Sequence, residues 1–144
     1  MNKIGRSELI DLPEMGLYGM SAKVDTGAYT SCIHCKDAQV VDFFGCPILH
    51  FSLLAHPSRP EWDQRFYFSD FQEREVKNSS GQKKKRYVIQ TAVCIFGEQI
   101  LTEFTLNDRS NLKFPILLGR KFLKSKFIVD VTKTNLSLVQ VINL

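Results

Sequence analysis

Apolar and polar residues alternate over short stretches along most of this chain, a pattern that predicts β-strands. The alternation is clearest at 87–95 and again at 100–106, where every second residue is apolar or a threonine. Gly97 and Glu98 lie between the two stretches and supply a turn signal. We therefore expect an antiparallel hairpin in this part of the chain.

Shorter apolar runs predict further strands on both sides of this hairpin. They lie at 4–12, 21–24, 38–44, 48–54, 65–72, 114–118, 127–131 and 136–142. Helical periodicity is almost absent, and only 120–124 is expected to form a helical turn, after Gly119. Many short strands with regular turns favour an all-β fold, either a closed barrel or a sandwich.

Glycine, proline and polar residues mark the connections between these strands. Residues 15–20 form a glycine-punctuated link, and 45–47 (Gly-Cys-Pro) are a turn signal. Residues 56–60 contain two prolines, which lack a backbone donor, so we expect a loop there. Residues 132–135 are expected to form a turn. The most polar stretch is 74–86, which we expect to be an exposed β-arm with its tip at 78–81.

The composition is typical of one globular domain spanning residues 1–144. Residues 1–20 contain Glu8, Asp11 and Glu14 and no long apolar run, so neither a signal peptide nor a membrane span is predicted. We therefore expect a cytoplasmic protein that does not contact a membrane. The four cysteines are then expected to be free thiols.

The net charge of +4 depends largely on the Lys-Lys-Lys-Arg run at 83–86. Such a local patch can attract acidic partners by raising their encounter rate. A nucleic-acid-binding domain would instead carry basic residues over a whole face. Nucleic-acid binding is therefore not expected, and the run is read first as a solvated part of the arm.

Asp25 is the main candidate for chemistry, because it follows a strand and precedes Gly27 in the sequence Asp-Thr-Gly-Ala. An isolated Asp-Thr-Gly is more often an ordinary turn in which the aspartate side chain bonds its own backbone. A second apolar signal, Ile-Leu-Leu-Gly-Arg at 116–120, lies far downstream. The combination favours a functional role for Asp25.

These two elements resemble the signature of the retropepsin-like aspartic peptidases, in which Asp-Thr-Gly-Ala forms the catalytic loop. The wider pattern at 23–34, 74–81, 107–110 and 114–120 resembles a small bacterial family catalogued as ATP-dependent zinc proteases and associated with ATP-grasp amino-acid ligases. The chain has neither a His-Glu-x-x-His zinc motif nor a phosphate-binding Gly-x-x-x-x-Gly-Lys-Ser/Thr loop. The aspartic motif is therefore a better guide to function than the family's label.

The resemblance implies a closed retropepsin-like β-barrel with Asp25 and Gly119 close together beneath a flap. It assigns catalysis to Asp25, Thr26 and Gly27, with Thr26 bracing paired loops. It assigns substrate binding to Ala28, Ser79, Ser80, Gly81, Gly119 and Arg120. Viral relatives follow the motif with acidic residues, one of which pairs with the arginine; here those positions are Tyr29 and Thr30, so the partner of Arg120 is not given by the resemblance.

Peptide hydrolysis by an aspartic enzyme needs two carboxylates that share one proton, because like charges at short range cannot both ionise. The chain contains Asp-Thr-Gly only once. The second carboxylate must then come from another copy of the chain, so we expect a homodimer with Asp25 of each subunit at the two-fold axis. No cofactor is expected for this reaction.

Cys32, His34 and Cys35 suggest a zinc site, since thiolate and imidazole are good zinc ligands. On a strand, however, Cys32 and His34 share one face and Cys35 points to the other. Cys46 or Cys94 would have to complete the site. Buried thiols are the commoner explanation, and we predict no metal here.

Three functions remain open from the sequence. The leading one is a homodimeric aspartic endopeptidase acting on a cytoplasmic protein or peptide. The second is a non-catalytic module that binds an extended peptide and regulates an amino-acid ligase. The third is a zinc-dependent hydrolase.

Overall fold

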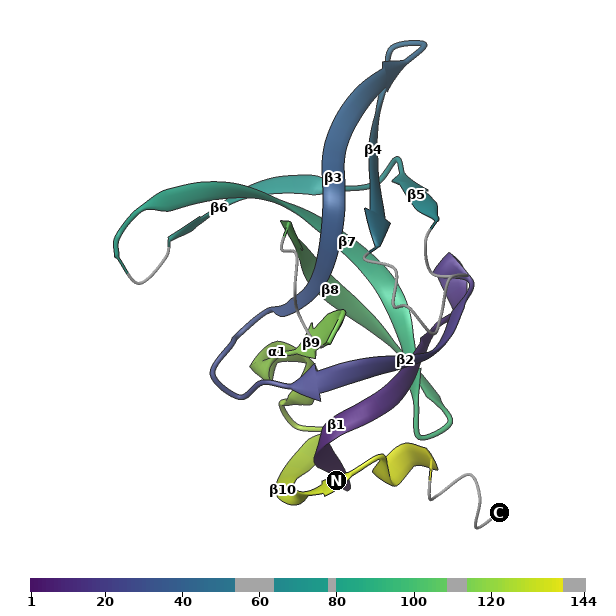
Figure 1. The fold of residues 1–144 in the computed structure, drawn as a ribbon, viewed down its shortest axis with the longest axis vertical. Helices are drawn as coiled ribbons and strands as arrows, with labels where there is room; N and C mark the ends of the chain where they lie inside the picture. Colours follow the sequence, from purple (N-terminus) through teal and green to yellow (C-terminus); the bar gives the residue numbers. More distant parts are fainter. Residues whose placement is uncertain (54–63, 78–79, 109–113, 139–144) are drawn as a thin grey trace.

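The computed structural model describes residues 1–53, 64–77, 80–108 and 114–138. Strands dominate, as the alternating pattern predicted (Figure 1). In chain order the elements are β1 (Asn2–Leu12), the 3-10 turn η1 (Pro13–Met15), β2 (Leu17–Val24), β3 (Ser31–Phe43), β4 (Cys46–Leu53), β5 (Arg65–Phe68), β6 (Gln72–Lys77), β7 (Lys83–Ile95), β8 (Glu98–Asp108), β9 (Ile116–Leu118), α1 (Arg120–Leu123) and β10 (Phe127–Thr134). No helix in these ranges is long and apolar enough to cross a membrane.

The strands form a closed barrel, which confirms the predicted fold class. Neighbouring strands follow the order β1, β2, β9, β3, β8 and β7, and β7 pairs back with β1 at Asp11 and Cys94. β10 extends the sheet beside β1, and β6 extends it beside β7. The short β9 is central to the site, because it pairs in parallel with β2 and antiparallel with β3.

The barrel interior holds the alternating apolar residues of nearly every strand. The largest fully buried side chains are Phe51, Phe104, Ile4, Ile10, Leu12, Leu17, Met20, Ile33, Leu49, Leu53, Ile89 and Ile116. Burying each such side chain contributes on the order of 1.5–3 kcal/mol. The core therefore extends directly beneath the ends of β2 and β9, where the candidate site lies.

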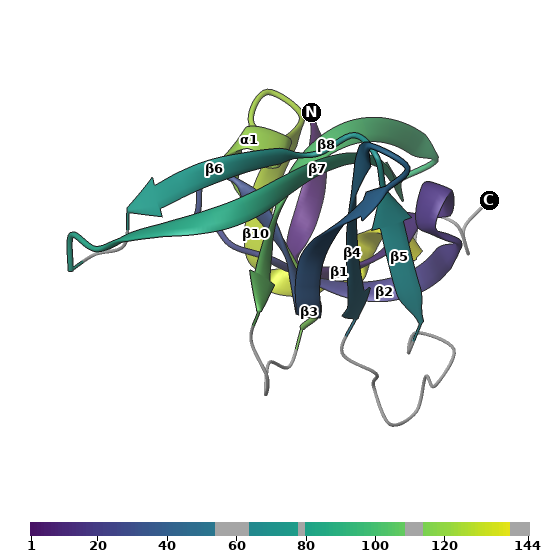
Figure 2. The same cartoon turned by 90° about the horizontal axis from the view of Figure 1, so that it is seen from above.

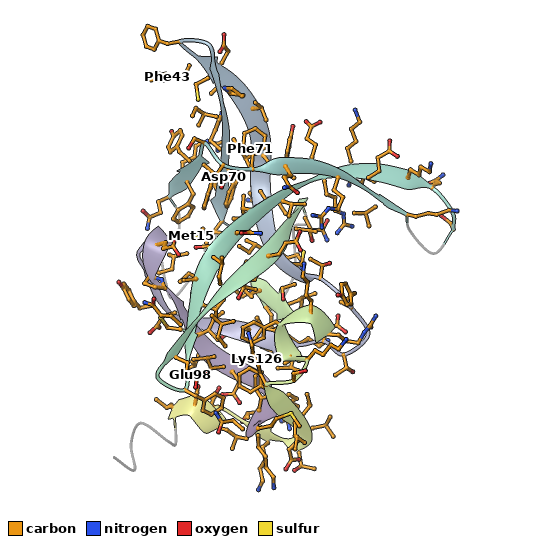
Figure 3. All side chains as sticks on the ribbon, turned by 180° about the vertical axis from the view of Figure 1, so that it is seen from behind. Met15, Phe43, Asp70, Phe71, Glu98 and Lys126 are labelled. Carbon is orange, nitrogen blue, oxygen red and sulfur yellow. The ribbon has the colours of Figure 1, made fainter. Side chains whose placement is uncertain are left out.

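Two hairpins project from the barrel (Figures 1 and 2). The β3–β4 hairpin ends at Phe43, labelled at its tip in Figure 3, and at Phe44. Phe44 and Gly45 have φ of 52° and 83°, so the turn lies at these two residues rather than at the predicted 45–47. Cys46 and Pro47 already belong to β4.

The second projection is the predicted arm, formed by β6 and the first half of β7. Its strands pair from Gln72 with Val88 to Lys77 with Lys83. The predicted single strand at 65–72 is wrong, because β5 pairs with β4 whereas β6 pairs with β7. Phe71, at the start of the arm in Figure 3, packs against Tyr87. The predicted proline loop at 56–60 lies outside the described residues.

The predicted link at 15–20 is also wrong in part, because β2 already begins at Leu17. Only Gly16, with φ of 66°, turns the chain after η1. Gly19 also has a positive φ but lies inside the strand, where its N–H donates to Asp11 Oδ1 at 2.8 Å. This bond and the buried Leu17 and Met20 hold the segment against β1.

The carboxyl-terminal predictions fail at 132–138. β10 continues to Thr134, and residues 136–138 are helical instead of extended. The cause is Glu8, which is 1% exposed and accepts the N–H groups of Leu136 and Ser137 at 3.1 and 3.0 Å. A carboxylate that accepts the first N–H groups of a helix stabilises that helix start.

Candidate active site

The candidate catalytic loop, residues 25–30, connects β2 to β3 at one end of the barrel (Figure 1). The Asp25 N–H donates to the Leu118 carbonyl oxygen at 2.9 Å, which continues the pairing of β2 with β9. Both strands are buried at this end, Val24 at 8% exposure and Leu118 at 0%. The fold therefore brings together the two sequence motifs, although 93 positions separate Asp25 from Leu118 in the chain numbering.

Gly119 lies directly against the backbone of this loop. A Cβ at position 119 would lie 2.7 Å from the Tyr29 carbonyl oxygen and 2.9 Å from the Ala28 carbonyl oxygen. Real Cβ atoms essentially never approach so closely, and here the obstacle is backbone. The glycine of the second motif is thus required by close packing on the Asp25 loop.

Hydrogen bonds from the start of α1 fix the same loop. The Arg120 and Lys121 N–H groups donate to the carbonyls of Ala28 and Tyr29 at 2.8 and 2.9 Å. The Gly119 N–H donates to the buried Ser31 Oγ at 3.0 Å. These bonds hold the second half of the loop, while the bond from Asp25 to Leu118 holds its start, which is the kind of support that a catalytic group needs.

Asp25 is half-buried, whereas Thr26 and Gly27 are exposed. Asp25 Oδ1 accepts the Gly27 N–H at 3.0 Å, so the local turn is the ordinary aspartate turn considered above. This turn uses only Oδ1 of the carboxylate. The second oxygen keeps its lone pairs, so the carboxylate can still act as an acid or a base. The result is a fixed acid at an accessible edge of the barrel.

Arg120, whose partner the resemblance left open, contacts two groups of the loop. Its Nη1 donates to the Thr26 carbonyl oxygen at 3.0 Å, and its guanidinium lies 5.7 Å from the centre of the Tyr29 ring. The second distance is within the range of a cation–π interaction. Tyr29, which departs from the viral pattern, therefore supplies a contact to the same arginine.

The arm passes over the side of the barrel that carries the Asp25 loop and α1, as two perpendicular views agree (Figures 1 and 2). Ser80 and Gly81 follow β6 at its outer end, and Gly81 has φ of 86°. Ser79 lies outside the described residues. The arm thus has the position expected of a flap, and contact between its tip and a substrate remains a prediction.

The residues of the zinc hypothesis are buried in the first part of β3. Cys32, His34 and Cys35 are 7%, 2% and 0% exposed. His34 Nδ1 lies 2.9 Å from the Phe114 carbonyl oxygen, which gives this histidine a structural contact. All four cysteines are thiols, and no cluster of three or more histidine, cysteine or acidic residues occurs within the described ranges.

One charged cluster near the site was missed in the sequence. Glu103 on β8 accepts hydrogen bonds from Lys121 of α1 and, at 2.5 Å, from Arg74 of the arm. The hydrogen bond from Lys121, helped by Arg74, holds the pKa of Glu103 below its ordinary value of 4.5 against the opposing effect of burial. No spacing rule connects three residues so far apart, so only the fold could reveal the cluster.

Comparison with solved structures supports this description of the fold. The crystal structure of a Legionella pneumophila protein of unknown function superposes with a TM-score of 0.70 and covers 94% of this chain and 98% of its own. The two sequences are 23% identical. The likeness therefore extends to the fold alone.

Curated relatives are longer proteins. The chain is 30% identical over 131 residues to a "Probable alpha-L-glutamate ligase" of Shewanella pealeana, and 33% identical over 129 residues to a protein of the same name from Desulfotalea psychrophila. These matches cover 91% and 88% of this chain but only 29% and 27% of the relatives. The chain thus corresponds to less than a third of each ligase.

A family model described as the retropepsin-like aspartic endopeptidase RimB matches residues 3–138, a range that includes the Asp25 loop, the arm and Gly119. This match agrees with the barrel, with the joined Asp-Thr-Gly and Leu-Gly-Arg motifs, and with the resemblance read from the sequence. The chain belongs to the RimB-like family of retropepsin-like proteins.

Proposed function

We propose that this chain is one subunit of a homodimeric aspartic endopeptidase. The observation that carries the proposal is the way Asp25 is held: its loop is hydrogen-bonded to Leu118 and α1 and packs against Gly119, yet Thr26 and Gly27 remain exposed. An exposed rigid loop can meet its own copy across a two-fold axis. The two Asp25 carboxylates would then share one proton.

In this mechanism one Asp25 carboxylate takes a proton from a water molecule, whose oxygen attacks the peptide carbonyl carbon. The other Asp25, protonated, gives its proton to the carbonyl oxygen, and a tetrahedral intermediate forms. Its collapse breaks the C–N bond: the leaving amine takes up the proton held by the first Asp25, and a hydroxyl of the intermediate returns its proton to the second Asp25 as the new carboxyl group forms. Water is consumed, and the dyad returns to its singly protonated state.

The expected substrate is an acidic peptide. Lys83, Lys84 and Lys85 lie on the exposed part of β7, in the arm that overhangs the Asp25 loop. Cations at that place favour an anionic chain by raising its encounter rate. The relatives named "Probable alpha-L-glutamate ligase" favour the same substrate class, since a region similar to this chain lies within proteins named for ligating an acidic amino acid.

The test is cleavage of a glutamate-rich peptide by the wild type and by Asp25→Asn, with a glutamine-rich peptide of equal length as the matched substrate. The wild type should cleave the acidic peptide, and Asp25→Asn should bind it without cleavage. Sedimentation and activity are measured together over a dilution series, and activity should fall as the dimer dissociates. Full activity in a monomeric sample, or in Asp25→Asn, would refute the shared dyad.

A second candidate is a non-catalytic module that binds peptides for a glutamate ligase. The specific observation in its favour is that the curated relatives contain this region within ligases. The exposed edge of β6 could accept an extended peptide as an added strand. Peptide binding that is equal in the wild type and Asp25→Asn, with no cleavage by either protein at any concentration, would favour this candidate.

A further inference from the structure

Glu103 contacts both structural parts that surround the candidate active site. Its Oε1 accepts a hydrogen bond from Arg74 Nη2 at 2.5 Å, and its Oε2 accepts one from Lys121 Nζ. The Glu103 side chain is 8% exposed, whereas Arg74 and Lys121 are 42% and 51% exposed. The carboxylate is therefore the buried centre of the cluster and its cations form the rim.

The two cations belong to different elements. Arg74 lies on β6, the outer strand of the arm. Lys121 lies in α1, and its backbone N–H donates to the Tyr29 carbonyl oxygen of the Asp25 loop at 2.9 Å. A continuous series of polar contacts therefore connects the arm to the Asp25 loop through a single carboxylate.

Two cavities that open to solvent border this carboxylate. A cavity of about 110 Å³ lies on the side of the arm, lined by Asp70, Phe71, Gln72, Val88, Gln90 and Glu103. A second cavity of about 110 Å³ lies on the side of α1 and includes Glu103, Lys121, Phe122 and Lys126 in its lining. Both cavities are open to solvent, so the arm and α1 are joined at this point by the charged contacts of Glu103 and not by enclosed apolar packing.

We infer that Glu103 is a positioning residue that couples the orientation of the arm to the Asp25 loop. The inference rests on the proposed function for its catalytic consequence, but the mechanical coupling can be measured without activity. The ionised state that it requires agrees with the lowered pKa of this group. A role in stability alone would require no such link between the two segments.

The experiment combines hydrogen exchange with kinetics on the full chain. Glu103→Gln keeps the shape of the side chain and removes its charge. Glu98→Gln, an exposed acid at the start of the same strand and labelled in Figure 3, is the matched control. Amide exchange is followed at 72–77 in the arm and at 25–30 in the loop, and peptide cleavage is followed in parallel.

Glu103→Gln should raise exchange in both segments and lower kcat about tenfold, with a smaller change in KM, because misplaced catalytic groups mainly reduce kcat. Arg74→Gln should raise exchange most in the arm and also, to a smaller extent, in the loop, and Lys121→Gln should do the converse; a rise confined to the segment that carries the substitution would mean two independent contacts without coupling. Both of these residues are exposed enough to replace without loss of folding. Glu98→Gln should change neither measurement.

Exchange that rises in only one segment of Glu103→Gln, or equally over the whole barrel, would overturn the coupling. If exchange changes in both segments but the wild type cleaves no peptide, the coupling holds and the proposed peptidase function fails. If both segments respond and kcat is unchanged, Glu103 is not a positioning residue for catalysis. The two proposals can therefore fail separately.

Discussion

Gly119 and Tyr29 approach so closely that a Cβ at position 119 would lie 2.7 Å from the Tyr29 carbonyl oxygen. Three backbone hydrogen bonds surround this contact, two from α1 to the loop and one from Asp25 to Leu118. The loop therefore cannot move away from an added methyl group without breaking bonds that position Asp25. The second sequence motif acts as a support for the first.

Gly119→Ala should consequently destabilise the chain by about 1–3 kcal/mol, the usual cost of overpacking. It should also lower kcat/KM under conditions in which the protein is still folded. Gly45→Asn is the control, because nothing lies within 4 Å of a Cβ there and asparagine tolerates the φ of 83°. Urea unfolding and kcat/KM are the measurements. A Gly119→Ala protein with wild-type values of both would contradict the close packing.

Arg120→Lys should lose the bond from Nη1 to the Thr26 carbonyl and the contact with Tyr29, since a lysine ammonium cannot reproduce the planar fork. Arg120 is exposed, so the loss of stability should be at most about 1 kcal/mol. Cleavage should fall more strongly, because Thr26 is adjacent to Asp25.

Two variants give the comparison for Arg120. Tyr29→Leu removes the ring and should lower kcat/KM less than Arg120→Lys does. Lys124 is a nearby exposed cation, and Lys124→Gln should leave kcat/KM unchanged. Melting temperature and kcat/KM are measured for all three. An Arg120→Lys protein with the kcat/KM of the wild type would show that the loop needs neither contact.

The strands could be predicted from local information, whereas the closed barrel and the meeting of Asp25 with Gly119 were predicted from the family resemblance that the two motifs carry. Alternation identifies a strand that is buried on one face, as at 87–95 and 100–106. The motifs around Asp25 and Gly119 carry their own chemical pattern. The helical turn after Gly119 was also predicted, and α1 (Arg120–Leu123) confirms it.

The failures have a different physical origin, since they depend on residues distant in sequence. The helical form of 136–138 is fixed by Glu8, which no local pattern connects to Leu136. Phe66 and Phe71 look like one alternating strand, yet Phe66 packs against Phe51 and Phe71 against Tyr87. In the sequence Glu103 has the pattern of an ordinary exposed charge, and only the fold places Arg74 and Lys121 beside it.

Glu8→Ala tests the first of these long-range effects. Glu8 Oε2 accepts the Gly5 N–H at 2.8 Å in addition to the Leu136 N–H, and Oε1 accepts the Ser137 N–H. Alanine leaves these donors without their carboxylate in a buried site, at a cost of about 3 kcal/mol. Glu73→Ala, on the exposed arm, should cost less than about 0.5 kcal/mol.

Urea unfolding measures both variants, and exchange at 136–138 should rise in Glu8→Ala. An unfolding free energy equal to that of the wild type would mean that the carboxylate is not needed to hold this end of the chain to β1.

Glu103 should also make stability depend on pH. The Lys121 hydrogen bond lowers the pKa of Glu103 below 4.5 in the folded chain, while the unfolded chain keeps the ordinary value. The unfolded state therefore binds the proton first as the pH falls, and stability decreases below about 4.5 until the folded pKa is passed. Above pH 4.5 the contribution of this group is complete.

Glu103→Gln has no titrating group at position 103, so it should be less stable than the wild type at pH 6. The difference in unfolding free energy between the two proteins should narrow toward pH 3. Urea unfolding between pH 6 and pH 3 measures the unfolding free energy of the wild type, of Glu103→Gln and of the control Glu98→Gln. A difference in unfolding free energy that stays constant between pH 6 and pH 3 would mean that the charge of Glu103 does not stabilise the fold through Arg74 and Lys121.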